Sequence, residues 1–462
     1  MKSSRINLVV AAGLSMVLLG SCNIYKKFEL PIDESALVEE YSKALEQPVD
    51  SSALGNLDWR TVFTDPVLQD LINQALANNI DLKNAKLNVD IANAQLRGAK
   101  LNYLPSLAIA PSGQGSKFQD AGPMSWGYSI PAQVSWEIDI FAKLLNSKRG
   151  AQAGVMQSRA YEQAVRSQII AAVANCYYSI ATLESQLELT KATAENWRQS
   201  VEVMKNLKLA GRVNESAVVQ STAQYYGILA SIPDLESALT QAGNSMSLLL
   251  GVMPQKWTVN PGAVLTAPAE MTGAIPMRAL ASRPDVAAAE LGLAVAYYST
   301  NSARAAFYPG LNITANGGFT NMLGSMITNP GKFFINLGAS LVAPIFSRGA
   351  NIAALEAAKA RQQQALNTFE NTIMSAAADV SDAMTAYENS QKKARLLVEQ
   401  TANLEKSVEY TQELLVYGTS TYLEVLTAQS NLLSSQMNEL SNRLTAAQSV
   451  INLYQNLGGG RQ

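Results

Sequence analysis

The sequence predicts a mainly α-helical fold with a membrane β-barrel part, and three observations lead to this prediction. Two hairpin-like segments of the 462-residue chain alternate apolar and polar residues over lengths that can cross a bilayer. Each is followed by a helical pattern much longer than the helices of a compact domain. The whole order then occurs a second time, so we predict a duplicated helix–β-hairpin–long helix–helix unit.

The clearest strand lies between Trp126 and Lys143, where even-numbered residues are apolar and odd-numbered residues are mostly polar or small. Side chains on a strand alternate between two faces, so this segment has one apolar and one polar face. It exceeds the roughly 9–11 residues that a tilted strand needs to cross a bilayer. Taken alone, the pattern also fits a half-buried strand of an ordinary sheet. The residues that we assign to membrane strands are Tyr128, Trp136, Ile138, Ile313, Phe333 and Ile335.

The N-terminus is predicted to be a lipoprotein signal peptide. Lys2 and Arg5 precede a short apolar run, and Leu19-Gly20-Ser21-Cys22 resembles a bacterial lipobox, in which the chain is cut before the cysteine and the cysteine is lipidated. A plain secretory signal is the alternative. Asn23, which follows the lipidated residue, favours retention in the outer membrane.

The domains that we predict follow from these features. They are a signal peptide at 1–21, a lipid-anchored lead-in at 22–58, a first repeat at 59–251 with a hairpin at 105–141, a crossover segment at 252–276, a second repeat at 277–458 with a hairpin at 309–346, and a C-terminal tail at 459–462.

The composition excludes several classes of site. The chain has no histidine, and its two cysteines are Cys22 and Cys176, the second within an apolar helical stripe. Zinc sites, Ser-His-Asp triads and Cys-His dyads are therefore excluded. The formal charge of −2 argues against a nucleic-acid partner. We expect no enzymatic activity and no cofactor apart from the covalent lipid on Cys22.

A tandem duplication is visible as ordered matches between the two halves. Ala75-Leu76-Ala77 returns as Ala279-Leu280-Ala281, an offset of 204 residues, and Gly211 returns as Gly418, an offset of 207 residues. An ordered series of such matches along the chain is typical of an internal repeat.

Four of the predicted helices lie at about 66–103, 142–210, 214–250 and 350–417. Asp65-Pro66 is a typical helix start, and Gly211 is typical of a helix end. The helix at 350–417 would be about 100 Å long at about 1.5 Å per residue, and its apolar residues recur in steps of three and four, as in a coiled coil. Such helices indicate a protein that bridges the periplasm.

Barrel closure requires more than one chain. A single chain supplies four membrane strands, and an open sheet edge is not tolerated in lipid. A homotrimer would supply 12 strands, within the range of known barrels.

The chain resembles, along nearly its whole mature length, the outer membrane factor (TolC-like) family, in its lipoprotein branch that serves resistance-nodulation-division efflux pumps (NodT/OprM-like). The residues that carry this resemblance are Phe63-Thr64-Asp65-Pro66, Tyr103-Leu104-Pro105, Ser135-Trp136-Glu137-Ile138-Asp139 and Tyr417-Gly418-Thr419 with Leu423-Glu424-Val425. The resemblance implies a trimeric 12-stranded β-barrel that continues into an α-helical coiled-coil tunnel. It also implies a periplasmic adaptor (membrane fusion) protein and an inner-membrane pump as partners.

The resemblance further implies a pore constriction at the periplasmic helix turns. These turns follow Gly211 and Gly418, and members of the family place two acidic residues just after the second turn. Glu424 matches the first of them, whereas Thr427 stands at the second position, and Ser420 lacks the charge of a latch. An exposed carboxylate that complements the N-terminus of a helix is the alternative role of Glu424.

The function implied is that of a passive exit duct for drugs or other small solutes across the periplasm and outer membrane. The same architecture also fits the duct of a type I protein secretion system. A lipid-anchored coiled-coil scaffold without a pore is the alternative from a different class. The identity of the exported substrate does not follow from the sequence.

Overall fold

The computed structural model describes residues 25–48, 54–117, 124–260, 277–322, 331–417 and 420–461. It divides into two compact units. Unit 1 comprises Met1–Glu34, Leu87–Arg159 and Ala288–Glu370, and unit 2 comprises Ser35–Lys86, Ala160–Ala287 and Asn371–Gln462. Each unit therefore takes segments from both predicted repeats, and the two are described separately below.

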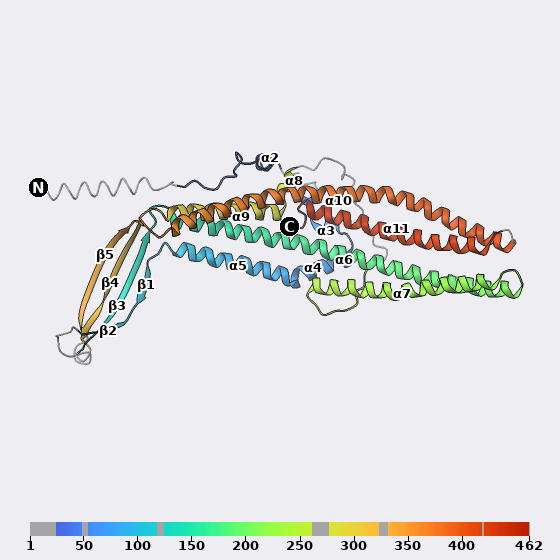
Figure 1. Ribbon diagram of the computed structural model, residues 1–462, viewed down its shortest axis with the longest axis horizontal. Helices are drawn as coiled ribbons and strands as arrows, with labels where there is room; N and C mark the ends of the chain where they lie inside the picture. Colours follow the sequence, from blue (N-terminus) through green and yellow to red (C-terminus); the bar gives the residue numbers. More distant parts are fainter. Residues whose placement is uncertain are drawn as a thin grey trace. The chain divides into compact units, whose positions relative to one another are not determined.

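Unit 1 contains one antiparallel sheet (Figure 1). Its strands are β1 (Ser106–Ile109), β2 (Ser112–Ser116), β3 (Ser125–Ile138), β4 (Gly310–Met322) and β5 (Lys332–Val342). The order is β1-β3-β4-β5, and β2 pairs with the N-terminal part of β3, whereas β1 pairs with a later part of the same strand. The sheet thus has four strand positions, as the fold class requires.

The first strand of the first hairpin is interrupted, which the sequence analysis did not predict. The hairpin expected at 105–141 begins with two short strands, because β1 and β2 are separated at Ala110 and Pro111. Pro111 has no N–H to donate to a ladder, and Pro131 of β3 lacks one as well. Ala110 still donates a hydrogen bond of 3.0 Å to the carbonyl of Pro131, so the two short strands follow one line.

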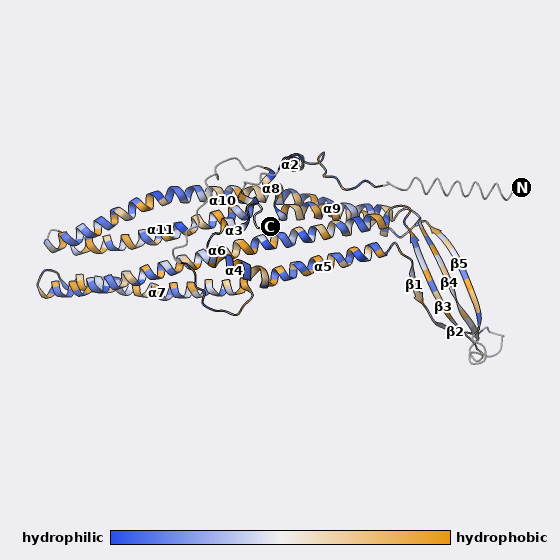
Figure 2. Ribbon diagram, turned by 180° about the vertical axis from the view of Figure 1, so that it is seen from behind, coloured by the Kyte–Doolittle hydropathy of each residue, from blue (hydrophilic) through white to orange (hydrophobic). Residues whose placement is uncertain are grey.

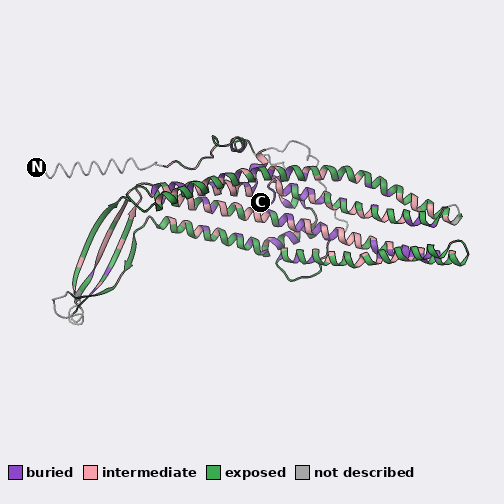
Figure 3. Cartoon of the chain, in the orientation of Figure 1, coloured by how far each residue is buried: buried purple, intermediate pink, exposed green. Residues whose placement is uncertain are grey.

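The register of β3, β4 and β5 sorts their residues into apolar and polar rows. One apolar row is Ile130, Phe319 and Phe333, and another is Trp136, Ile313 and Ala339. The intervening residues point to the other face because strand side chains alternate. Figure 2 shows that the strands carry both apolar and polar residues. β5 is exposed along almost its whole length (Figure 3), and Leu337 is 80% exposed.

The helices, in chain order, are α2 (Ala36–Leu45), the short 3₁₀ helix η2 (Leu54–Asn56), α3 (Trp59–Val62), α4 (Pro66–Asn78), α5 (Ile80–Leu101), α6 (Lys143–Leu209), α7 (Glu215–Leu250), α8 (Met277–Ala281), α9 (Pro284–Ala305), α10 (Ala350–Tyr417) and α11 (Tyr422–Asn456). The predicted long helices are confirmed as α6, with 67 residues, and α10, with 68 residues. Among the described residues, no helix is both long and apolar enough to span a membrane.

Two helical hairpins lie in unit 2. The ion pair between Lys191 and Glu236, 3.0 Å, joins α6 to α7. In the second hairpin, Asn442 of α11 donates a hydrogen bond of 2.9 Å to the carbonyl of Ser390 in α10. Figure 1 shows each pair running side by side.

The predicted single helix over 66–103 is wrong, because the chain breaks at Asn79. The backbone of Asn79 is extended, with ψ 133°, and its side-chain oxygen accepts hydrogen bonds from the N–H groups of Asp81 and Leu82. Asn79 therefore ends α4 and caps α5, a role that suits asparagine. The second repeat breaks at the matching place, where Pro284 begins α9.

Asp65 of the Phe63–Pro66 motif links the start of α4 to α6. One oxygen of its carboxylate accepts a hydrogen bond of 2.8 Å from the N–H of Val67, and the other accepts one of 2.8 Å from the hydroxyl of Tyr177. The ring of Tyr177 is fully buried, and burial raises the pKa of its hydroxyl. The motif thus fixes the entry of the chain into the core of unit 2.

The C-terminal segment is part of this core. Gly459 and Gly460 are buried, and the guanidinium of Arg461 donates a hydrogen bond of 2.8 Å to the carbonyl of Ser282. Arg461 also bonds the carbonyl of Gly55, 406 residues earlier in the chain. The predicted tail therefore ties together three distant segments of unit 2.

Candidate functional site

The turn between α6 and α7 is set by Gly211. Its φ of +71° lies in the left-handed region, which glycine adopts without strain. The N–H of Gly211 donates to the carbonyl of Lys208, and the N–H of Arg212 donates to that of Leu207. This pattern is a Schellman motif, so the helix end expected at Gly211 is confirmed. Asn214 then caps α7 by accepting a hydrogen bond from the N–H of Ala217.

Glu424 lies in the first turn of α11, and its carboxylate is tied to the preceding turn. It accepts hydrogen bonds from the hydroxyl of Ser420 and from the N–H of Thr421, the second at 3.3 Å. These bonds stabilise the charged form, and they lower the pKa of Glu424 below its ordinary value. Ser420 therefore holds Glu424 by a hydrogen bond and not by an ion pair. Glu424 also lies where its alternative role requires, as an exposed carboxylate at the N-terminus of a helix.

The first two turns of α11 have two different faces. Tyr422, Val425 and Leu426 are buried, whereas Glu424 and Thr427 are exposed. The spacing of three residues places Glu424 and Thr427 on the same side of the helix. The two residues predicted to form a constriction are thus adjacent and accessible.

The exposed face of α11 continues beyond these residues, which the sequence analysis missed. Its members are Glu424, Thr427, Asn431, Ser434, Asn438 and Ser441, and we call this set the α11 polar face. They recur in steps of three and four, so they form one line on the helix. Glu424 is the one charged member of the set. The signal in the sequence was a helical spacing of hydroxyl and amide residues, but polar residues on a helix usually indicate nothing more than a solvated surface.

The two repeats differ at the position of Glu424. An offset of 207 residues, which relates Gly211 to Gly418, relates Glu424 to Ala217. Ala217 is 7% exposed and belongs to an apolar cluster with Trp197 and Leu426. A carboxylate at the position of Glu424 is therefore specific to the second repeat, whereas α7 begins with Glu215, which pairs with Lys208.

The polar face of the sheet in unit 1 carries few charges, and its charged residues at paired positions are Glu137 and Lys332. Cross-strand rows on this face are Gln133, Asn316 and Asn336, then Ser135, Thr314 and Gly338, then Glu137, Asn312 and Ser340. The carboxylate of Glu137 forms an ion pair of 2.9 Å with Lys143, which offsets its charge. Amide and hydroxyl groups can donate and accept hydrogen bonds, so this face suits contact with water and polar solutes.

The residues assigned to membrane strands lie in the sheet. Trp136 and Ile313 are direct cross-strand partners and are 38% exposed each, and Phe333 and Ile335 of β5 are each 62% exposed. Ile138 pairs with Leu311 in another apolar row. Tyr128 differs, because it is only 8% exposed.

Two of the predicted site residues, Cys22 and Gly418, lie outside the described residues. The chain is described from Tyr25 onward, and its first described residues dock on helices of unit 1. The N–H of Phe28 donates a hydrogen bond of 3.1 Å to the hydroxyl of Tyr298, and Arg149 bonds the carbonyl of Tyr25. A lipid on Cys22 would thus be attached three residues before a segment with a fixed position in that unit.

Comparison with known proteins gives a consistent set of relatives. A family model described as outer membrane efflux protein matches residues 71–252 and 275–459. The probable outer membrane lipoprotein SilC of Salmonella typhimurium is 30% identical over 407 residues, which cover 87% of this chain and 88% of SilC. The cation efflux system protein CusC of Escherichia coli K12 is 29% identical over 409 residues, covering 88% and 89%.

Solved structures agree with these relatives. A crystal structure of CusC matches with a TM-score of 0.80 and 28% identity, and the match covers 94% of this chain and 98% of that one. The open state of the MtrE outer membrane channel of Neisseria gonorrhoeae matches with a TM-score of 0.77 and 27% identity, covering 90% and 94%.

Proposed function

The chain belongs to the outer membrane efflux protein family, and we propose that its periplasmic entrance lies at the first turns of α11, with Glu424 and Thr427 facing the lumen. The protein is the outer membrane channel of a tripartite efflux pump. Proteins of this family are homotrimers that work with a periplasmic adaptor and an inner-membrane pump. This assignment favours the efflux duct over the secretion duct and the scaffold.

Trimer formation explains the sheet. Four strand positions from each of three chains supply 12 strands, and closure pairs the edge strand β5 of one chain with β1 and β2 of the next. The apolar rows then face lipid, and the polar rows, with Asn316 and Asn336, face the lumen.

The observation that carries the proposed entrance is the α11 polar face. Three copies of Glu424 around a threefold axis would form a ring of carboxylates, followed by rings of Thr427 and Asn431. A ring of negative charge favours cations, whereas the uncharged residues behind it interact with solutes by hydrogen bonds. Within one chain, the hydrogen bonds from Ser420 and Thr421 lower the pKa of Glu424, which opposes the rise that repulsion between three neighbouring carboxylates would cause.

The cargo is proposed to be chosen by the pump and not by the duct. Relatives of this chain serve different solutes, since CusC is a cation efflux protein and TtgC of Pseudomonas putida is a toluene efflux pump outer membrane protein. A wall of hydroxyl and amide groups, such as Asn431 and Asn316, accommodates both kinds of solute.

The lipid anchor is also a proposal. Cys22 follows a lipobox-like sequence, and the relative SilC is named as an outer membrane lipoprotein. Acylation of Cys22, with no other cofactor, would place the chain in the outer membrane beside the barrel. Mass spectrometry of the N-terminal peptide tests this attachment.

Thiol labelling tests the proposed entrance. Thr427→Cys in lipid bilayers should react with a cationic methanethiosulfonate reagent, and the conductance should fall because the reagent obstructs the lumen. Gln220→Cys is the matched control, because Gln220 is exposed and lies at the equivalent place of α7. The native thiol of Cys176 should react slowly, because burial raises its pKa to about 11. Rapid labelling of the thiol introduced in Thr427→Cys, without loss of conductance, would refute the proposal.

A further inference from the structure

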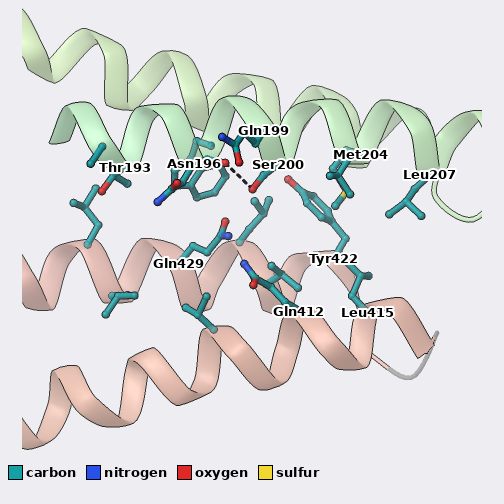
Figure 4. A pocket seen from close by; sticks show the side chains of 18 of the residues that line it. Thr193, Asn196, Gln199, Ser200, Met204, Leu207, Gln412, Leu415, Tyr422 and Gln429 are labelled. Carbon is teal, nitrogen blue, oxygen red and sulfur yellow. Dashed lines mark hydrogen bonds between the residues drawn. The ribbon is translucent and has the colours of Figure 1, made fainter. Parts of the chain in front are cut away.

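A cavity of about 740 Å³ lies in unit 2, between α6 on one side and the ends of α10 and α11 on the other. Figure 4 shows side chains of these helices facing one another across it, among them Asn196 and Met204 of α6, Gln412 of α10, and Tyr422 and Gln429 of α11. Its volume is within the range of about 300–1,000 Å³ that is typical of pockets for small organic molecules.

The lining of this cavity combines an apolar wall with uncharged polar groups. Trp197, Met204 and Leu426 supply apolar surface, and Gln412, Gln429 and Gln436 supply amides. Among the described residues that line it, Arg212 is the one charged residue, and none carries a carboxylate. A cationic ligand would therefore find no charge partner, whereas an uncharged aromatic molecule would match the wall.

Two buried polar atoms at this cavity have no hydrogen-bond partner within the part of the chain that the structure describes. They are the side-chain oxygen of Gln429, an acceptor, and the hydroxyl of Tyr422, which has the side chain of Ser221 as its polar neighbour. Tyr422 is only 8% exposed. Leaving a buried polar group without a partner is unfavourable, so a ligand that bonds these atoms gains affinity by satisfying them.

The cavity lies directly behind the proposed entrance. Tyr422, Val425 and Gln429 line it from the inner side of α11, while Glu424 and Thr427 are on the exposed side of the same turns. A molecule in the cavity touches both α6 and the beginning of α11. Its binding therefore stabilises conformations in which α6 and the beginning of α11 are separated by the thickness of the ligand.

We propose that this cavity is a regulatory site for an uncharged, aromatic, amphipathic molecule that carries a hydrogen-bond donor and an acceptor. The donor meets the oxygen of Gln429, the acceptor meets the hydroxyl of Tyr422, and the ring packs against Trp197. Occupancy keeps the first turns of α11 away from α6 and favours the open entrance. The effect on conductance rests on the proposed function, but the binding does not.

Binding is measured with chloramphenicol, an uncharged nitroaromatic amide that quenches indole fluorescence. Equilibrium dialysis of the radiolabelled probe against the lipidated trimer in nanodiscs should give saturable binding of one molecule per chain. Saturable quenching of Trp197 fluorescence should follow the same curve, and Trp197→Phe should remove that component of the quenching. Probe binding without saturation would overturn the proposal.

Three variants locate the bound probe. Gln429→Leu keeps the side-chain volume but removes the buried acceptor, and it should weaken binding about tenfold. Ser200→Trp places an indole in the cavity and should abolish binding. Ser434→Ala, on the exposed side of α11, should bind as the unchanged protein does. Equal affinity in all three variants, each checked for an intact trimer, would place the probe elsewhere and overturn the proposal.

Single-channel recording tests the regulatory effect. The probe should raise the open fraction of the unchanged channel and leave that of Ser200→Trp unaffected. Saturable binding without any change in the open fraction would refute the coupling to the entrance. Glu424→Gln should bind the probe normally, so a failure of the charged entrance and a failure of this site give different results.

Discussion

The side-chain amide of Asn79 donates a hydrogen bond of 2.9 Å to the carbonyl of Leu249, 170 residues later in the chain. The second repeat has the corresponding contact, because the guanidinium of Arg283 donates one of 3.3 Å to the carbonyl of Asn456. Offsets of 204 and 207 residues relate the two pairs, as they relate the repeats themselves. The duplication has thus kept a specific contact, although the side chain that makes it has changed from an amide to a guanidinium.

Replacement of Arg283 should destabilise unit 2. Its side chain is only 10% exposed, and besides Asn456 it bonds Asp285 at 2.7 Å and Asp379 at 3.1 Å. Arg283→Met should cost about 2–3 kcal/mol, because several buried hydrogen bonds to a charged group are lost. Thermal unfolding followed by circular dichroism should show a lower midpoint. Arg198→Met, which removes an exposed ion pair, is the control and should change the midpoint little. Equal unfolding midpoints for Arg283→Met and Arg198→Met would contradict the stabilising role of Arg283.

Stability should fall in acid partly through Asp285. Burial alone would raise the pKa of this carboxyl, but hydrogen bonds and charge from Arg283 outweigh burial and lower it. A lowered pKa stabilises the fold above the ordinary pKa of an aspartate, near 4, and this contribution is lost as the pH falls through the lowered value. Asp285→Asn should therefore lower the midpoint at pH 7 and flatten its dependence on pH in this acidic range. An unchanged pH dependence would refute the role of Asp285.

A methyl group at Gly459 should disrupt the C-terminal segment. A Cβ at this position would lie 2.5 Å from the ring of Tyr454, whereas at Gly98, inside α5, it would meet nothing within 4 Å. Gly459→Ala should lower the yield of folded trimer, while Gly98→Ala should be neutral or stabilising by about 0.5–1 kcal/mol. The amount of heat-resistant trimer on gels measures the effect of both substitutions. Normal trimer in Gly459→Ala would show that this segment adapts easily.

The register of β4 predicts opposite effects of a charge at neighbouring positions. Ala315 lies in the apolar row with Val134 and Leu337, and Asn316 lies in the polar row with Gln133 and Asn336. Ala315→Lys should cost up to about 2–4 kcal/mol, because the charge faces lipid. Asn316→Lys should assemble normally and reduce the permeability to cations. Equal assembly of the two variants would contradict the assignment of faces.

Long periodic elements could be predicted from the sequence, whereas features set by single contacts could not. The helix expected at 350–417 is α10, Ala350–Tyr417, because an apolar repeat over many turns leaves one register. The break at Asn79 was missed because its signal is one side chain whose partner, Leu249, is distant in sequence. The burial of Gly459 and Gly460 was missed for the same reason.

The candidate site was predictable only in part. Glu424 was identified through a family resemblance, but its hydrogen bonds to Ser420 and Thr421 depend on the geometry of the turn. The cavity behind it is formed by three helices from two repeats, and its lining residues follow no sequence motif. In the sequence, nothing distinguishes Trp197 or Gln429 from other residues of a helix.

The ion selectivity of the reconstituted trimer tests the central claim, that Glu424 lines the entrance of the channel. Glu424→Gln removes the charge but keeps an oxygen that can accept from Ser420 and Thr421, and Glu424→Ala removes the charge and these hydrogen bonds together. In a salt gradient, the reversal potential of both variants should lie farther from the equilibrium potential of the cation than that of the unchanged protein does. Both variants should still form trimers. Glu236→Gln, which removes a carboxylate from α7, should leave it unchanged. A reversal potential in Glu424→Gln equal to that of the unchanged protein would show that this carboxylate does not face the path of the ions.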